Sequence, residues 1–141
     1  MRLPEIGDRK HLDAVLVRTD YSDTSGWPAL RAALGMEGGG VWPLLVVEDP
    51  SWAGATADDV RKAARDDGNL DVVFVADRTA LADPEHKVLA VEVGGAAGKL
   101  RVVPGWVMLV HGTLALTDMR FGDFVEAADG DSAGAFRGFP D

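Results

Sequence analysis

In the first half of the chain, short apolar runs alternate with stretches of helical periodicity. The runs at 13–18, 41–48 and 71–76 are bounded by polar residues and are typical of buried strands. Pro43 in the second run indicates that this strand starts unpaired or lies at an edge of its sheet. Residues that recur at helical spacing between the runs are Trp27, Leu30 and Leu34 in the first interval and Val60, Ala63 and Ala64 in the second.

Capping and helix-breaking residues set the expected ends of these two helices. Pro28 is tolerated only if it lies in the first turn of its helix, and Gly35 is a natural stop. Thr56 predicts the start of the second helix because Asp59 follows three residues later, which is an approximate capping box. Residues 68–69 (Gly-Asn) end it. The order strand-helix-strand-helix-strand favours parallel strands joined by right-handed crossovers.

The second half of the chain predicts a hairpin. Residues 88–93 and 100–103 have the pattern of strands, and the Gly-rich link at 94–98 suits the turn between them. Residues 77–84 are expected to form a loop with at most one helical turn. Residues 104–110 fit a short helix or a strand.

A final helix and a Gly-rich tail follow. Asp118 is the expected cap, and the buried face of the helix is expected to be Phe121, Phe124, Val125 and Ala128. In the tail at 129–141, Phe136 and Phe139 are expected to dock on the core, because a free tail would not hide them. The chain therefore predicts a single α/β domain over residues 1–141. We expect a mixed sheet of about five strands with a β-α-β-α-β start, an antiparallel hairpin and a C-terminal helix.

Charge and composition narrow the classes of partner. The chain has 23 acidic and 14 basic residues, a net charge of −9 and no cysteine. Because the basic residues are scattered along the chain, we expect no basic surface that could bind nucleic acid or an anionic membrane. An acidic surface could instead attract a basic protein. Without cysteine there is no disulfide or thiolate metal site. Neither a signal peptide nor a membrane-spanning run is found, so a cytoplasmic location is expected.

Several strings resemble catalytic or ligand-binding motifs but lack the context those motifs need. Residues 130–134 (GDSAG) match the G-x-S-x-G elbow, yet a helix rather than a strand precedes Ser132 and no histidine follows it. Residues 94–99 (GGAAGK) are one residue short of a phosphate-binding loop, and Leu100 replaces the hydroxyl that would hold magnesium. Both are interpreted as turns.

The isolated histidines and tryptophans also favour structural roles. His11, His86 and His111 form no i,i+3 or i,i+4 pair, so they predict no local metal motif, and solvent-exposed or capping roles are favoured. Tryptophans more often pack in the core or at its rim than bind ligands. The four tryptophans are Trp27, Trp42, Trp52 and Trp106.

Polar residues that follow the first three strands form the candidate site. Parallel strands end at one edge of a sheet, where open α/β folds bind ligands. Carboxylates that converge there could hold magnesium or raise one another's pKa values for acid–base work. Aspartate is also favoured in such turns because its side chain binds nearby backbone amides, and the two arginines could simply neutralise the acids. The candidate binding rim consists of Arg18, Asp20, Glu48, Asp49, Asp77 and Arg78.

Six segments together span nearly the whole chain and carry a family resemblance. They are LVRTDYSD (16–23), WPALRAAL (27–34), DPSWAGATADDV (49–60), FVADRTALADPEH (74–86), LALTDMRFGDFVEAAD (114–129) and FRGFP (136–140). These segments resemble an uncharacterised family of small acidic actinobacterial proteins. The resemblance implies an actinobacterial cytoplasmic protein. It carries no known activity and no assigned catalytic residues. Members often have a longer polar stretch after the RVVP segment, where this chain has the more apolar residues 106–110.

Three functions remain open from the sequence. The favoured one is a non-catalytic interaction protein, similar to an immunity protein or a regulator, whose partner is a basic protein. The second is a small-molecule binding module that uses the tryptophans. The third is a metal-dependent enzyme that uses the acids at the strand exits. No catalytic residue, resident metal or cofactor is predicted.

Overall fold

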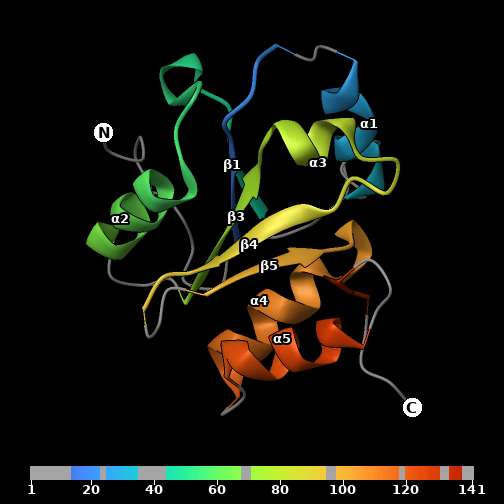
Figure 1. Ribbon diagram of the computed structural model, residues 1–141. Helices are drawn as coiled ribbons and strands as arrows, with labels where there is room; N and C mark the ends of the chain where they lie inside the picture. Colours follow the sequence, from blue (N-terminus) through green and yellow to red (C-terminus); the bar gives the residue numbers. More distant parts are fainter. Residues whose placement is uncertain are drawn as a thin grey trace.

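The computed structural model describes residues 14–22, 25–34, 44–67, 71–94, 98–117, 120–130 and 134–137. Within them, a six-stranded sheet has the order β2-β1-β3-β4-β5-β6 (Figure 1). The strands are β1 (Ala14–Arg18), β2 (Leu44–Val47), β3 (Val72–Ala76), β4 (Val88–Glu92), β5 (Lys99–Val102) and β6 (Ala135–Phe136).

The strand directions confirm the predicted mixed sheet. Strand β1 is parallel to both β2 and β3, so the β-α-β-α-β start is present. Strand β4 is antiparallel to β3 and to β5, which is the predicted hairpin. Strand β2 lies at an edge of the sheet, as Pro43 indicated. The sixth strand, β6, is parallel to β5 and was not predicted.

Helices cover both faces of the sheet. Helix α2 (Ala57–Asp67) packs on one face, as the core residues that it shares with β1 and β3 show. The other face is covered by four helices. In Figure 1, α1 and α3 lie in the upper part of the view, and α4 and α5 lie in the lower part. These are α1 (Gly26–Ala33), α3 (Arg78–Ala82), α4 (Val107–Leu116) and α5 (Phe121–Asp129). Two 3-10 turns, η2 (Pro50–Trp52) and η3 (Pro104–Trp106), precede α2 and α4.

The central strands are apolar apart from Arg18 at the end of β1, because both of their faces are buried. All five residues of β1 and all five of β3 are buried. Strand β3 has neighbours on both sides, β1 and β4, and Val73 and Phe74 are completely buried. A continuous apolar run is therefore the correct signature of these strands.

Local signals for the first two helices are confirmed where the structure describes them. Pro28 lies in the first turn of α1, and Trp27 and Leu30 are buried. The capping box at the start of α2 is present: Asp59 N donates to Thr56 Oγ1 (3.1 Å) and Thr56 N donates to Asp59 Oδ2 (3.0 Å).

Three local expectations need correction or refinement. The N-cap of α5 is Arg120 rather than Asp118, since Asp123 Oδ2 accepts from Arg120 N (2.8 Å) and the helix starts at Phe121. His111 is buried in α4 rather than exposed or capping, because it lies on the side of that helix that faces the sheet. Residues 104–110 are helical, as η3 and the start of α4.

Some predicted features lie outside the described residues. They are residues 1–11 with His11, Gly35, Trp42, residues 68–69, Asp118, Ser132 and Phe139. Within the described residues, Trp27 and Trp52 are buried, and Phe136 is fully buried as expected. No helix in that part of the chain is long and apolar enough to cross a membrane.

Candidate functional site

The carboxyl ends of β1, β2 and β3 lie at one edge of the sheet, which places the whole candidate binding rim there. The register aligns Val17 with Val47 and with Val75, so the three strands end together. The edge is fastened by the backbone of Thr19, whose N–H donates to Ala76 O (3.1 Å) and whose carbonyl accepts from Gly54 N (2.8 Å). The predicted convergence of strand exits is therefore present.

Arg18 is the buried centre of the first half of this edge. Its guanidinium carbon lies 4.3 Å from the centre of the Tyr21 ring and 4.8 Å from that of Trp27. Its Nε donates to the Asp20 carbonyl (3.0 Å) and its Nη1 to Glu48 Oε1 (3.2 Å). Arg18 thus joins the exits of β1 and β2, and its charge is matched by Glu48.

Asp20 and Asp49 each stabilise the turn in which they lie. Asp20 Oδ1 accepts from the backbone N–H (3.3 Å) and the hydroxyl (2.8 Å) of Ser22. Asp49 Oδ1 accepts from Ser51 N (3.0 Å) and is the N-cap of η2. These contacts are the local role that favours aspartate after strands.

Asp77 has two tasks. It is the N-cap of α3, since its Oδ1 accepts from Ala80 N (3.0 Å). It also forms a bidentate ion pair with Arg101, at 2.9 Å to Nη1 and 2.7 Å to Nη2. Arg78, which the sequence offered as a neutralising partner, is an exposed residue at the start of α3. The neighbour that neutralises Asp77 comes instead from β5.

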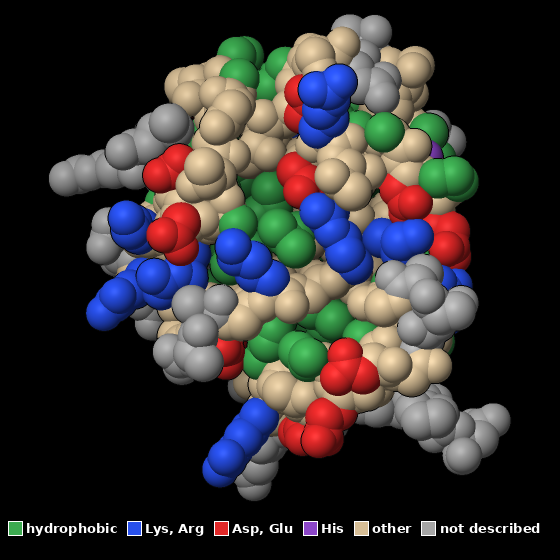
Figure 2. All heavy atoms as spheres, in the orientation of Figure 1, with side chains coloured by type: hydrophobic (Ala, Val, Ile, Leu, Met, Phe, Trp, Pro, Cys, Tyr) green, Lys and Arg blue, Asp and Glu red, His purple; other side chains and the backbone are tan. Residues whose placement is uncertain are grey.

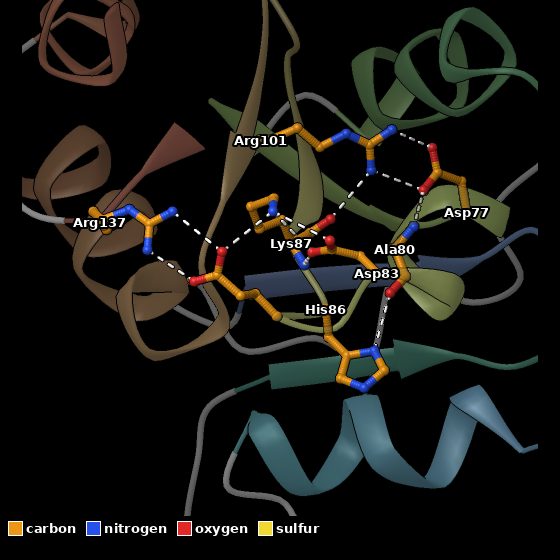
Figure 3. A network of polar contacts seen from close by, with 8 residues as sticks. Asp77, Ala80, Asp83, His86, Lys87, Arg101 and Arg137 are labelled. Atoms are coloured by element: carbon orange, nitrogen blue, oxygen red, sulfur yellow. Dashed lines mark hydrogen bonds and ion pairs between the residues drawn. The ribbon is translucent and has the colours of Figure 1, made fainter. Parts of the chain in front are cut away.

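The Asp77–Arg101 pair leads into a wider polar network (Figure 3). Arg101 Nη1 also donates to the Lys87 carbonyl (3.2 Å). Lys87 Nζ pairs with Asp83 (3.2 Å) and with Glu85 (3.4 Å). Arg137, just after β6, donates to both oxygens of Glu85 (2.8 and 3.2 Å). The network thus ties the C-terminal strand to the connection between α3 and β4.

His86 supports the same connection. Its Nδ1 lies 3.0 Å from the Ala80 carbonyl oxygen, which can only accept in a hydrogen bond. Its backbone φ is +51°, in the left-handed region that non-glycine residues seldom adopt. His86 is half-buried.

The electrostatics of the network favour the charged form of each group whose pKa is shifted. The hydrogen bond from Arg137 lowers the pKa of Glu85. Burial acts to raise the pKa of Asp83, but hydrogen bonds from the backbone and side chain of Lys87 together lower it. The hydrogen bond to Asp83 raises the pKa of Lys87. At the other half of the edge, burial raises the pKa of Tyr21.

The arrangement stabilises turns and strand ends. Asp20 and Asp49 accept from their own turns, while Glu48 and Asp77 pair with different arginines. Among the described residues, no group of three or more His, Asp or Glu side chains could hold a metal ion. The candidate binding rim is therefore one edge in space, divided into separate local contacts.

Sequence reasoning missed most of the second half of this edge. The i,i+4 spacing of Asp83 and Lys87 is a signal that could have identified their pair. Arg101 and Arg137 carry no such signal, because they reach the site only through the order of the strands. Sequence reasoning also missed two large hydrophobic residues that are exposed, Trp106 (38%) and Leu109 (41%).

Comparison with known proteins adds a family match. A family model described as a domain of unknown function, DUF6924, matches residues 13–139. No curated protein matches the chain.

Proposed function

Because the chain belongs to the DUF6924 family, whose function is not assigned, we propose a function from its own side chains. It is a non-catalytic, acidic, cytoplasmic protein that acts by binding a basic protein, as an immunity protein or a regulator does. The observation that carries the proposal is the net charge of −9. A charge of this size on a domain of this length attracts a basic partner over a distance and speeds their association.

The directions of the pKa shifts in the polar network and its surroundings support a non-catalytic role. A general acid or base works best with a pKa near the working pH. Five groups have a pKa that moves away from neutrality: Asp59, Asp83 and Glu85 downward, and Lys87 and Tyr21 upward. These shifts are those of groups that hold a fold together by charge and hydrogen bonding.

Affinity capture at two salt concentrations tests the proposal. The purified chain is immobilised and exposed to extract of the cells that produce it, at about 50 mM and about 500 mM salt, because exposed charges are strongly screened at the higher value. We expect one basic protein to be retained in near-stoichiometric amount at low salt and released at high salt. A retained acidic protein, or a partner held equally at both salt concentrations, would contradict the proposal.

A metal titration separates this proposal from a metal-dependent enzyme. A ligand that binds only the folded state raises the melting temperature. We expect Mg²⁺ and Mn²⁺ at millimolar concentration to leave the melting temperature unchanged. A rise that is abolished by Glu48→Gln with Asp49→Asn would favour the metal-dependent reading instead.

A further inference from the structure

The two halves of the carboxyl edge differ in how far their polar side chains are bonded within the protein. At one half, Asp77 uses both carboxylate oxygens in its ion pair with Arg101. At the other half, around Arg18, three buried side-chain atoms make no hydrogen bond within the described residues. They are Asp20 Oδ2, Tyr21 Oη and Trp27 Nε1. A buried polar atom without a partner is rare and costs stability, so the Arg18 half has hydrogen-bonding groups that the fold itself does not use.

Three hydrogen-bond donors gather at the Arg18 guanidinium. Its carbon lies 4.3 Å from the centre of the Tyr21 ring and 4.8 Å from that of Trp27, so both side chains are held against it. Its described hydrogen bonds use Nε and Nη1, which leaves the two N–H groups of Nη2. The Tyr21 hydroxyl and the indole N–H of Trp27, a residue only 6% exposed, are the other two donors. Donors held in place beside a cation are suited to bind a carboxylate.

The start of α1 adds to this attraction for an anion. Trp27 lies in the first turn of this eight-residue helix, whose N-terminus carries a partial positive charge. No acidic residue lies in that turn. Figure 1 shows α1 following β1 in the upper part of the view, so the helix starts at the carboxyl edge of the sheet.

Three carboxylates at the same half of the edge each keep one oxygen outside the described hydrogen bonds. Those bonds use Asp20 Oδ1, Glu48 Oε1 and Asp49 Oδ1. Burial is the main cause that raises the pKa of Tyr21, and the charges of Glu48 and Asp49 raise it further, so both acids lie near the donors. The Glu48 side chain is 43% exposed whereas that of Arg18 is 9% exposed, so Glu48 lies on the solvent side of the buried guanidinium.

The balance of charge at this half of the edge selects the ligand. Three carboxylates and one guanidinium leave two negative charges in excess. A simple anion would be repelled by that excess, and a simple cation would leave the three donors without a partner. A molecule with one carboxylate and two cationic groups satisfies both. Figure 2 shows a face on which Lys and Arg side chains lie among Asp and Glu side chains, so the net charge alone does not select a place for such a molecule.

We propose that the Arg18 half of the carboxyl edge binds a free basic α-amino acid, of the class of arginine and lysine. The carboxylate of the ligand accepts from Arg18 Nη2, the Tyr21 hydroxyl and the Trp27 indole N–H. Its α-ammonium and its side-chain cation donate to the remaining oxygens of the three acids, which are Asp20, Glu48 and Asp49. This site goes beyond the proposed function, because it requires no partner protein.

Titration calorimetry with L-arginine tests the site, and two analogues each remove one group of the ligand. Agmatine is arginine without the carboxylate, and N-acetyl-L-arginine lacks the α-ammonium. We expect saturable binding of L-arginine, and binding of each analogue that is at least about tenfold weaker, because each loses charge-assisted hydrogen bonds.

Tyr21→Phe is the key variant because it removes only the hydroxyl. It should weaken L-arginine binding about tenfold, while the melting temperature of the ligand-free protein stays the same or rises, since the lost hydroxyl had no partner there. Glu48→Gln should also weaken L-arginine binding. Its matched control is Asp71→Asn, which removes the same charge from an exposed residue just before β3, at the opposite end of that strand from the site. The control should bind L-arginine as the wild type does.

Absence of saturable binding of both L-arginine and L-lysine up to about 10 mM would overturn the proposal. Equal binding of L-arginine by the wild type and Tyr21→Phe would overturn it too. Agmatine that binds as tightly as L-arginine would replace the amino acid by a cation held on the acids alone. N-acetyl-L-arginine that binds as tightly would replace it by the C-terminal residue of a protein. Salt-dependent capture of a basic protein would stand in each case, because it rests on the net charge of the chain.

Discussion

Replacing Asp77 separates its two structural tasks. In Asp77→Ala, α3 loses its N-cap, which costs about 1 kcal/mol, and Arg101 loses its partner. Because both side chains of the ion pair are 26% exposed, solvent screening holds its contribution to roughly 1 kcal/mol. The alanine variant should therefore be destabilised by about 2 kcal/mol. Asn is as good an N-cap as Asp, so Asp77→Asn should lose only about 1 kcal/mol.

Urea denaturation followed by circular dichroism measures these differences. Arg101→Met is the matched control, since it removes the ion pair and leaves the N-cap of α3 intact. The double variant Asp77→Ala with Arg101→Met should cost about 1 kcal/mol less than the sum of the single variants, because they share one interaction. Equal costs for Asp77→Asn and Asp77→Ala would refute the contribution of the cap. Losses of stability below about 0.5 kcal/mol in both variants would refute the structural role of Asp77, because exposed residues without such contacts show losses of that size.

Three further predictions concern the core, a helix cap and acid stability. Phe74→Asp would bury an unpaired charge in the central strand and should abolish cooperative folding, so a normal melting curve would contradict the placement of β3. Thr56→Ala removes an N-cap and should lower the free energy of unfolding by about 1 kcal/mol in urea, and no loss would contradict the capping box. The pKa of Glu85 is lowered by Arg137, so its stabilising effect is present above the ordinary value of 4.5 and is lost as the pH falls through the folded-state pKa. Glu85→Gln should therefore lose less stability than the wild type between pH 6 and pH 3, and identical losses would contradict this contact.

The strands and most helices could be predicted because buried positions are occupied by apolar residues, whose spacing along the chain shows the type of element. Residues 14–17 of β1 and 72–76 of β3 are all apolar since helices cover both faces of the sheet there. Strand β6 could not be predicted, because two residues are too few to show a pattern. The start of α5 was misplaced because Asp118 is a better cap by residue type, whereas the Asp123 carboxylate accepts from the backbone of Arg120.

The position of the candidate binding rim followed from strand direction, but the partners of its acids did not. Asp20 and Asp49 bind residues two positions away, which local sequence can indicate. Arg101 pairs with Asp77 because the register lines up Val75, Leu89 and Arg101 across three strands. A contact of that kind depends on the antiparallel hairpin and is invisible in spacing along the chain.

Titration calorimetry of the chain with its captured basic partner is the most direct test of the proposed function. We expect the dissociation constant to rise steeply between about 50 mM and 500 mM salt, because complementary charges steer and hold the complex. Charge reversal at Glu126→Lys should weaken binding at low salt, while the folded state is retained because Glu126 is exposed. A dissociation constant that is the same at both salt concentrations, and the same for the wild type and Glu126→Lys, would contradict the proposed function.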